Sequence, residues 1–223
     1  MSVDKKKKQK EQKEQVRWDR LLVAVLLFIA VILLTAFLLS RIFPEDRDAQ
    51  DYAPEYAEKL LLTKNPYSRP GTKLKYVQNI VIHYVANPGT SAEANRNYFE
   101  NLRKKANNPD GISASAHFIV GLKGEVVQCI PLTEIAYANY PRNEDTVSIE
   151  VCHPDETGQF GEETYQTVVK LTSDLLKIYG LTADDVIRHY DISGKLCPKY
   201  YVENEDAWEK LREDIREAVN TKE

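Results

Sequence analysis

Residues 79–106, NIVIHYVANPGTSAEANRNYFENLRKKA, predict a buried strand followed by an amphipathic helix. The first part, 79–85, is short, apolar and rich in β-branched residues, which is typical of a strand inside a sheet. Thr90 and Glu93 then have the spacing of a capping box. Four side chains recur at helical spacing and form one apolar face: Ala94, Tyr98, Phe99 and Leu102. A strand that leads into such a helix indicates a sheet covered by helices.

The chain after residue 110 continues this alternation. Residues 115–131, SAHFIVGLKGEVVQCIP, predict two strands joined by a turn at 122–124, and residues 146–153, TVSIEVCH, predict another strand. A helix over 162–179 with Gly180 at its C-terminal cap, a short strand over 186–190 and a final helix over 206–219 follow. The predicted fold class is α/β, with a single mixed β-sheet flanked by helices, because the hairpin adds an antiparallel pair.

Residues 21–40, LLVAVLLFIAVILLTAFLLS, contain no charged side chain. A helix of this length rises about 30 Å, roughly the thickness of the hydrocarbon core of a bilayer, so we predict a transmembrane helix. A cleaved signal peptide is the alternative, but its apolar region is normally only about 7–15 residues long. Residues 1–20 carry eight Lys or Arg and four acidic residues, which predicts a cytoplasmic basic tail. The expected location is the cell membrane, with a single pass and the C-terminal part outside the cytoplasm.

Composition and charge divide the rest of the chain. Residues 41–76 are polar and rich in Pro, Asp and Tyr, which predicts a stalk or linker that leads into the domain, with packing of its end on the domain as an open alternative. Residues 77–223 form the predicted extracytoplasmic domain. The formal net charge is −4, and since the basic tail contributes +4, the chain after residue 40 carries −8. Nucleic-acid binding needs basic surfaces, so we expect no nucleic-acid partner.

Histidines and cysteines are the residues that could carry metal chemistry. His83 and His189 each lie near the end of a short apolar strand, where ligands collect in helix-covered sheets. Cys197 would add a thiolate, and two imidazoles with one thiolate leave a fourth position for water, as in catalytic zinc sites. From spacing alone the alternative stays open, because a histidine on an apolar strand is often a hydrogen-bonded core residue. Cys129 and Cys152 lie in apolar strands and are expected to be buried thiols rather than a disulfide.

Four motifs in a fixed order carry a family resemblance: NIVIHYVANPGTSAEANRNYF at 79–99, SASAHFIVGLKGEVVQCIPLTEIA at 113–136, SIEVC at 148–152 and HYDISGKLCP at 189–198. Over roughly residues 77–200 the chain resembles the zinc-dependent N-acetylmuramoyl-L-alanine amidases related to phage T7 lysozyme and the peptidoglycan recognition proteins. The resemblance implies an enzyme with Zn²⁺ as cofactor that hydrolyses the amide between N-acetylmuramic acid and the L-alanine of the peptidoglycan stem peptide. A Gram-positive-type bacterial source fits it.

The resemblance also implies roles for single residues. The zinc ligands of the family match His83, His189 and Cys197. The lysine assigned to transition-state stabilisation matches Lys195, and a glutamate placed near the zinc water in some members matches Glu150. Amide hydrolysis needs a proton acceptor, stabilisation of the oxyanion and a proton for the leaving nitrogen. Glu150 would provide the proton transfers, and zinc with Lys195 the stabilisation.

Two departures from the family pattern concern the substrate cleft. Some relatives have a catalytic tyrosine directly before the histidine of the SAHF strand, where this chain has Ala116, so the role of base would fall to Glu150 or to another group. Relatives often have Trp and His after the second motif, where this chain has Tyr137 and Asn139. His117 and Asn139 are the candidate substrate-binding residues, with a hydrogen bond to a neighbour as the alternative role for His117.

Two other functions compete with a hydrolase. A non-catalytic muropeptide-binding module of the same fold typically lacks a zinc ligand, and all three candidates are present. A scaffold or signalling protein would need a cytoplasmic domain, and a mostly charged tail of 20 residues is too short to fold into one. We therefore expect a monomeric enzyme with two partners, peptidoglycan and the lipid bilayer that surrounds residues 21–40. His153, in the loop HPDETG, is expected to lie in solvent.

Overall fold

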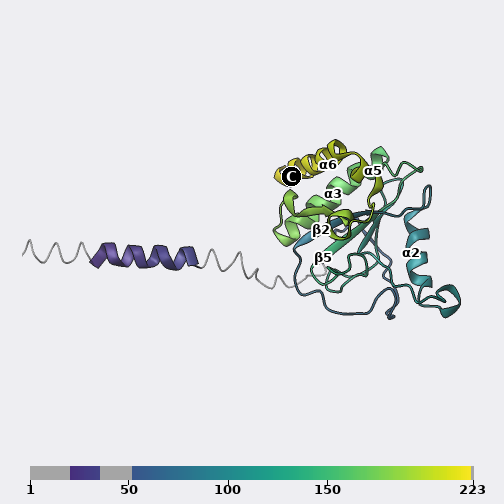
Figure 1. Ribbon diagram of the computed structural model, residues 1–223, viewed down its shortest axis with the longest axis horizontal. Coiled ribbons are helices and arrows are strands. Elements are labelled where there is room, and N and C mark those ends of the chain that lie inside the picture. Colours follow the sequence, from purple (N-terminus) through teal and green to yellow (C-terminus); the bar gives the residue numbers. More distant parts are fainter. Residues whose placement is uncertain (1–20, 36–51, 222–223) are drawn as a thin grey trace, which may run out of the picture. The chain divides into compact units, whose positions relative to one another are not determined.

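The computed structural model describes residues 21–35 and 52–221. The chain divides into an N-terminal unit, 1–45, and a compact domain, 46–223. In the N-terminal unit, residues 21–35 form one helix whose side chains are all exposed (Figure 1). Within the two described ranges, no helix combines the length and the apolar character needed to cross a membrane. The end of the predicted span, 36–40, and the predicted tail, 1–20, lie outside these ranges.

A six-stranded mixed sheet forms the centre of the domain, with the strand order β1-β4-β3-β5-β2-β6. Its strands are β1 (Glu58–Lys59), β2 (Asn79–Tyr84), β3 (Phe118–Val120), β4 (Val126–Gln128), β5 (Thr146–Val151) and β6 (Val186–Arg188). Neighbouring strands are parallel except for β3 and β4, which form the predicted hairpin. The prediction of a single mixed sheet is confirmed, and every predicted strand is present.

Helices cover both faces of the sheet (Figure 1). α2 (Ala92–Asn101) packs near β3 and β4 on one face, and α3 (Glu162–Tyr179) and α6 (Glu205–Asn220) pack against each other on the opposite face. The short helices α4 (His189–Ser193) and α5 (Lys199–Glu203) connect β6 to α6, and 3-10 turns occupy Lys105–Asn107 and Ala183–Asp185. Successive strand side chains point to opposite faces of the sheet, and each face has its own hydrophobic core. Phe118 and Val120 lie in the core between the sheet and α3, and Ile119 lies in the core between the sheet and α2.

The helix ends follow most of the predicted signals. Gly180 ends α3 with a φ of 59°, a left-handed conformation that the missing Cβ makes accessible. α2 begins after Ser91, whose hydroxyl accepts a 3.2 Å hydrogen bond from the backbone of the first turn. Thr90 donates instead to the carbonyl oxygen of Asn87, so the predicted capping box of Thr90 and Glu93 is wrong.

Residues 52–76 belong to the domain and do not form a free linker. β1 joins the sheet beside β4, and the side chains of Leu62 and Leu74 are buried. The guanidinium of Arg96 on α2 donates hydrogen bonds to the carbonyl oxygens of Leu60 and Leu61, each at 2.9 Å. The domain therefore begins before the predicted boundary at 77. The leucines at 60–62 are consecutive and Leu74 stands apart, so neither defines a strand or helix period that predicts its packing, and residues 41–51 of the predicted stalk lie outside the described ranges.

Candidate functional site

The three predicted ligands converge where β2 and β6 end. His83 lies on β2, His189 begins α4 directly after β6, and Cys197 lies between α4 and α5. Ile82 pairs with Arg188 in the parallel β2–β6 register. The residues that follow this pair along the chain, His83 and His189, therefore lie side by side. Their ring centroids are 4.6 Å apart, and Cys197 Sγ lies 3.6 Å from His83 Nδ1. We call His83, His189 and Cys197 the ligand cluster.

A short closed loop brings Cys197 back to His189. α4 ends at Gly194, whose φ of 73° lies in the left-handed region that favours glycine. Tyr190 N then donates a 2.9 Å hydrogen bond to Cys197 O, which closes the loop beside its own start. The sequence between the histidine and the cysteine is thus one short helix and a return loop, and this arrangement explains how two distant positions supply neighbouring donors.

The geometry of the ligand cluster fits a tetrahedral metal ion. One donor atom from each residue lies within 4.8 Å of the other two. Zinc bonds of about 2.05 Å to nitrogen and about 2.3 Å to sulfur, at a tetrahedral angle, would separate these donors by about 3.6 Å, in agreement with the distance from Cys197 Sγ to His83 Nδ1. His189 Nδ1 is buried and has no hydrogen-bond partner in the described part of the chain. A buried nitrogen without a hydrogen bond lowers the stability of the fold unless another group, such as a metal ion, binds its lone pair.

Burial sets the charge states of the ligand cluster. It lowers the pKa of His83 to about 3, with the neighbouring His189 as the second cause. Burial also lowers the pKa of His189, and the positive charge of Lys195 adds to this effect. Both imidazoles are therefore neutral at pH 7 and keep a lone pair for a metal ion. The pKa of the Cys197 thiol is raised by burial to about 12, so metal binding would displace its proton.

Glu150 lies beside the ligand cluster on the neighbouring strand. It pairs with His83 in the β2–β5 register, and its Oε1 lies 3.9 Å from His83 Nδ1. The other carboxyl oxygen, Oε2, is buried and finds no hydrogen-bond partner among the described residues. Burial raises the pKa of Glu150 to about 8, against the opposing charge of Lys195. A carboxyl group with such a pKa can take up and release a proton near neutral pH.

His117 and Asn139, the candidate substrate contacts, are buried and use their polar atoms inside the domain. His117 Nδ1 accepts a 3.1 Å hydrogen bond from Ser148 N, so Nε2 carries the ring proton and donates to Glu134 O at 3.0 Å. Asn139 lies next to the ligand cluster, with its Oδ1 2.7 Å from His83 Nε2. A substrate contact stays a prediction for both residues, while these bonds favour a role in holding the fold and the site.

His153 lies in a different environment from the predicted one. Its side chain is only 2% exposed, and its ring packs against the ring of Tyr84, with 5.1 Å between the centroids. Gly89 N donates a 2.9 Å hydrogen bond to His153 O, which holds the loop after β5 against the loop after β2. The expectation of a solvent-exposed His153 is wrong because neighbouring strand ends bring these two loops together.

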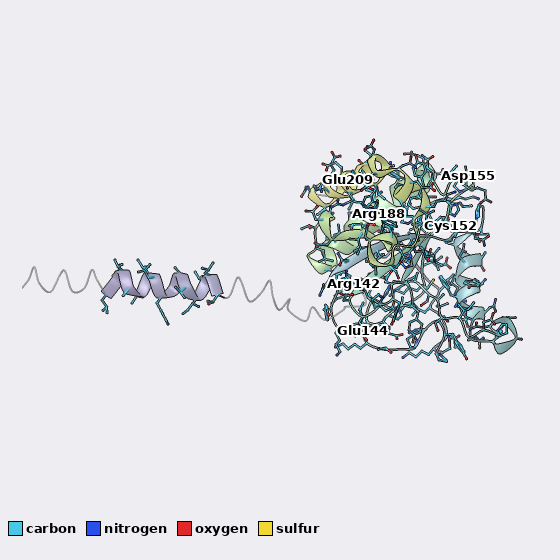
Figure 2. The ribbon with its side chains drawn as sticks, viewed as in Figure 1. Arg142, Glu144, Cys152, Asp155, Arg188 and Glu209 are labelled. Atoms are coloured by element: carbon cyan, nitrogen blue, oxygen red, sulfur yellow. The ribbon has the colours of Figure 1, made fainter. Side chains whose placement is uncertain are left out.

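Arg188 supports the ligand cluster and was not among the predicted site residues. Figure 2 labels Arg188 among the side chains of the domain. Its backbone N and guanidinium donate to Asp191, and the guanidinium also donates to Tyr201 O at 3.0 Å and to Glu205 at 2.7 Å. These bonds attach the start of α4, and with it His189, to α5 and α6. The sequence held one signal for this role, a charged residue inside a short apolar strand.

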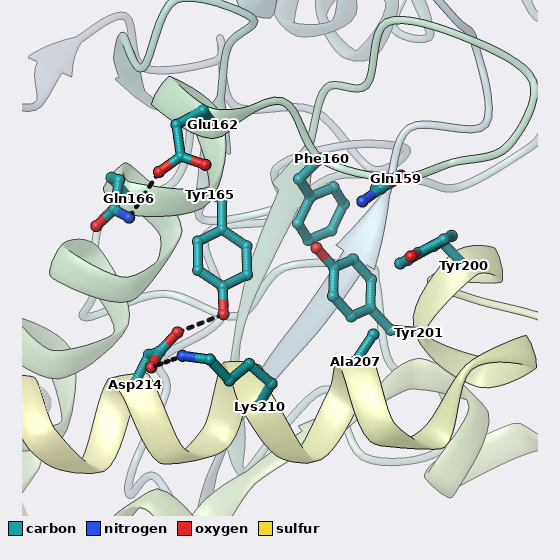
Figure 3. Close-up of a pocket in the computed structure, with 10 residues that line it drawn as sticks. All are labelled: Gln159, Phe160, Glu162, Tyr165, Gln166, Tyr200, Tyr201, Ala207, Lys210 and Asp214. Carbon is teal, nitrogen blue, oxygen red and sulfur yellow. Dashed lines mark hydrogen bonds and ion pairs between the residues drawn. The ribbon is translucent and has the colours of Figure 1, made fainter.

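A pocket of about 380 Å³ is lined by none of the ligand cluster. It lies among the loop before α3 and helices α3, α5 and α6 (Figure 3). Tyr165 donates a 2.7 Å hydrogen bond to Asp214, and Lys210 forms an ion pair with the same carboxylate. Three polar groups of the pocket thus already pair with one another, whereas His189 and Glu150 each have a buried atom that finds no partner among the residues the structure describes. The ligand cluster is the better candidate site.

Comparison with known proteins points to one family. A sequence profile described as N-acetylmuramoyl-L-alanine amidase (Amidase_2) matches residues 73–200. The N-acetylmuramoyl-L-alanine amidase CwlL of Bacillus licheniformis is 33% identical over 174 residues, which covers 71% of this chain and 46% of that protein. The N-acetylmuramoyl-L-alanine amidase BlyA of Bacillus subtilis (strain 168) is 32% identical over 179 residues, with the same two coverages. The chain spans about half the length of these curated relatives.

Solved structures share the fold. PlyL has a TM-score of 0.60 at 24% identity, over 74% of this chain and 99% of that chain. The catalytic domain of XlyA has a TM-score of 0.57 at 24% identity, over 71% of this chain and 98% of that chain. The sequence profile covers more than half of the chain and includes Glu150 and the whole ligand cluster. On this evidence, the chain belongs to the N-acetylmuramoyl-L-alanine amidase family.

Proposed function

We propose that this protein is a zinc-dependent N-acetylmuramoyl-L-alanine amidase, which hydrolyses the amide between N-acetylmuramic acid and the L-alanine of the peptidoglycan stem peptide. One observation carries the proposal: in a chain of this family, the ligand cluster lies beside Glu150, a partly exposed residue whose Oε2 atom is buried. A buried nitrogen of His189 and a buried oxygen of Glu150 that have no hydrogen-bond partner within 21–35 and 52–221 lower the stability of the fold. Unfavourable groups of this kind gather at functional sites.

His83, His189 and Cys197 would hold the zinc ion. Two neutral imidazoles and one thiolate give three protein ligands and leave the fourth position open, which is typical of catalytic zinc rather than structural zinc. Bound zinc supplies a Lewis acid that polarises the amide carbonyl and lowers the pKa of a water molecule towards 7. The spacing of 3.6 Å between nitrogen and sulfur supports this assignment.

Glu150 acts as the proton acceptor and donor in this proposal. Its carboxyl group is adjacent to His83, and burial holds its pKa at about 8 while the charge of Lys195 favours the carboxylate. Glu150 takes a proton from the attacking water and returns it to the leaving L-alanine nitrogen. Ala116 stands where some relatives have a tyrosine, so this chain has no hydroxyl at that position to share the proton transfer.

Lys195 contributes positive charge at the same place. It is exposed on the loop between α4 and Cys197, and its charge lowers the pKa of both ligand histidines and of Glu150. These effects indicate that the ammonium group acts on the site through space. A cation at this position stabilises the negative charge that develops on the amide oxygen during attack.

The anchor is a further part of the proposal. Residues 21–40 would hold the enzyme in the cell membrane with its N-terminus in the cytoplasm and the domain outside, which restricts cleavage to wall near the membrane. The support is a run of 20 uncharged residues, the exposed apolar helix over its described part, 21–35, and the basic residues before it.

Fractionation of cells that express the full chain tests the anchor. The wild-type chain should remain with the membranes after an alkaline carbonate wash. The double variant Leu27→Arg and Val31→Arg should lose this attachment, because each arginine at the centre of a span costs about 2.5–3.5 kcal/mol on insertion. Recovery of the wild-type chain in the soluble fraction would contradict the anchor and leave the amidase proposal untouched.

Mass spectrometry of a purified muropeptide tests the reaction. The full chain with zinc should produce two products, the N-acetylmuramic acid saccharide and a stem peptide with a free L-alanine amino group. Lys177→Ala, an exposed change at the end of α3, serves as the matched control and should leave the products unchanged. Cleavage at another bond would refute the proposed bond specificity. Binding of the muropeptide without cleavage would favour a recognition module.

A further inference from the structure

A row of three hydrogen bonds, two buried and the last partly buried, runs from the ligand cluster into the loop before β5. His83 Nε2 lies 2.7 Å from Asn139 Oδ1, and Asn139 Nδ2 lies 2.8 Å from Thr146 Oγ1. Thr146 Oγ1 in turn lies 2.6 Å from the carbonyl oxygen of Arg142. His83, Asn139 and Thr146 are each no more than 2% exposed as whole residues. We call these three bonds the Asn139 relay.

The last acceptor determines the direction of every bond in the relay. Arg142 O is a carbonyl oxygen and can only accept, so the one hydroxyl proton of Thr146 is donated to it. Thr146 Oγ1 must then accept from the amide of Asn139, which turns Nδ2 towards Thr146 and Oδ1 towards His83. Since Oδ1 cannot donate, the proton of the neutral His83 ring lies on Nε2 and the lone pair lies on Nδ1.

The backbone around Asn139 is held in place by the same loop. Asn143 Oδ1 accepts hydrogen bonds from Asn139 N at 2.7 Å and from Ala138 N at 3.2 Å. Arg142 N donates to Asn139 O at 2.6 Å, and the Arg142 guanidinium pairs with Asp145 at 2.7 Å. Hydrogen bonds and an ion pair within this loop therefore hold Asn139 in the position from which its amide contacts His83.

We propose that Asn139 and Thr146 are positioning residues that fix the tautomer of His83 and direct its Nδ1 to the metal ion. The inference rests on the proposed function, because it takes the ligand cluster as a zinc site. Nδ1 is the atom that lies 3.6 Å from Cys197 Sγ, so the relay directs the lone pair of His83 to the side of the other ligands. Loss of such a partner costs about 10–100-fold in metal affinity.

A substrate contact by Asn139 would have a different signature. The side chain of Asn139 is 1% exposed, and both ends of its amide are engaged within the relay. Removal of a substrate contact raises KM and leaves the zinc affinity unchanged. Removal of a positioning residue lowers the zinc affinity, even when no substrate is present.

Zinc affinity of the full chain, measured in mild detergent by competition with a chromophoric chelator, provides the first readout. Asn139→Ala should weaken zinc binding about 10–100-fold. Thr146→Val should weaken it less, and Thr146→Ser, which keeps the hydroxyl, should bind like the wild type. Asn108→Ala is the matched control, because Asn108 is also buried and, in the described part of the chain, its amide bonds to the backbone of Leu102 and Ile112 rather than to the ligand cluster. We expect this control to stay within about twofold of the wild type.

The position of the ring proton of His83 provides a second readout that needs no zinc. Nitrogen-15 NMR of the metal-free full chain at pH 7 should detect a slowly exchanging proton on His83 Nε2 in the wild type and in Asn108→Ala. This signal should disappear in Asn139→Ala. If Asn139→Ala does not fold, the comparison of Thr146→Val with Thr146→Ser decides in the same way.

Two results would overturn the inference. One is a ring proton on Nδ1 of His83 in the wild type, and the other is a folded Asn139→Ala variant that binds zinc within about twofold of the wild type. A wild-type chain that binds no zinc would refute the proposed function instead. The ring-proton measurement would still decide whether the relay fixes the tautomer.

Discussion

Replacement of His117 by glutamine should reduce the pH dependence of domain stability between pH 7 and 4. Burial lowers the pKa of His117 from 6.5 to about 4 in the folded chain. Below pH 6.5 the unfolded chain therefore takes up a proton that the folded domain does not, and the free energy of unfolding falls as the pH drops. The loss is complete below about pH 4, and above pH 6.5 both states are neutral, so His117 adds no pH dependence there.

The size of this effect follows from the burial of the ring. A pKa difference of about 2.5 units, at about 1.36 kcal/mol per unit, gives a loss of about 3 kcal/mol by pH 4. The side chain is 1% exposed, and protonation of Nδ1 would break the 3.1 Å hydrogen bond from Ser148 N. Glutamine can still donate to Glu134 O through its amide, and it has no group that takes up a proton.

Urea unfolding of the full chain at several pH values, with a chelator present, measures the difference. Between pH 7 and 4 the wild type should lose about 3 kcal/mol more unfolding free energy than His117→Gln. Other groups titrate equally in the two proteins and cancel in the comparison. Losses that agree within about 0.5 kcal/mol would refute the reasoning that burial keeps His117 neutral in the folded domain.

Three further predictions concern the reaction and the fold. Glu150→Gln should keep zinc and lose about 10²–10⁴-fold in kcat, because an amide cannot accept the proton; wild-type turnover would remove Glu150 from the mechanism. Cys197→Ser should lose its zinc on dialysis, since a hydroxyl replaces the thiolate; full metal content by atomic absorption would contradict the ligand set. Leu62→Ala should lower the free energy of unfolding by about 2–5 kcal/mol, as expected for a core leucine. A change below about 0.5 kcal/mol would argue against the inclusion of 52–76 in the domain.

The strands and the long helices could be predicted because each has a local pattern. The apolar run of β2 and the left-handed Gly180 after α3 are examples, and both are present in the structure. Contacts without a local pattern were not predictable. Leu62 packs into the domain from a stretch whose composition resembles a linker. Thr90 and Ser91 are adjacent hydroxyl residues that can each cap a helix, so the sequence did not indicate that Ser91 caps α2.

The candidate site could be predicted as a set of residue types, and less well as an arrangement. His83 and His189 were recognisable at strand ends, but their contact depends on the β2–β6 register, which no single strand specifies. Only the order of four motifs favoured a metal site over core histidines. Asn139 and Thr146 have no characteristic spacing, and their bonds to each other and to His83 depend on the path of the loop over 138–146.

The most direct test of the central claim counts new L-alanine amino termini released from purified peptidoglycan and compares them with bound zinc. The full chain with about one zinc ion per molecule should release them steadily. Removal of zinc by a chelator should stop the release, and added zinc should restore it. A folded, zinc-loaded chain that binds peptidoglycan and releases no amino termini would contradict the account.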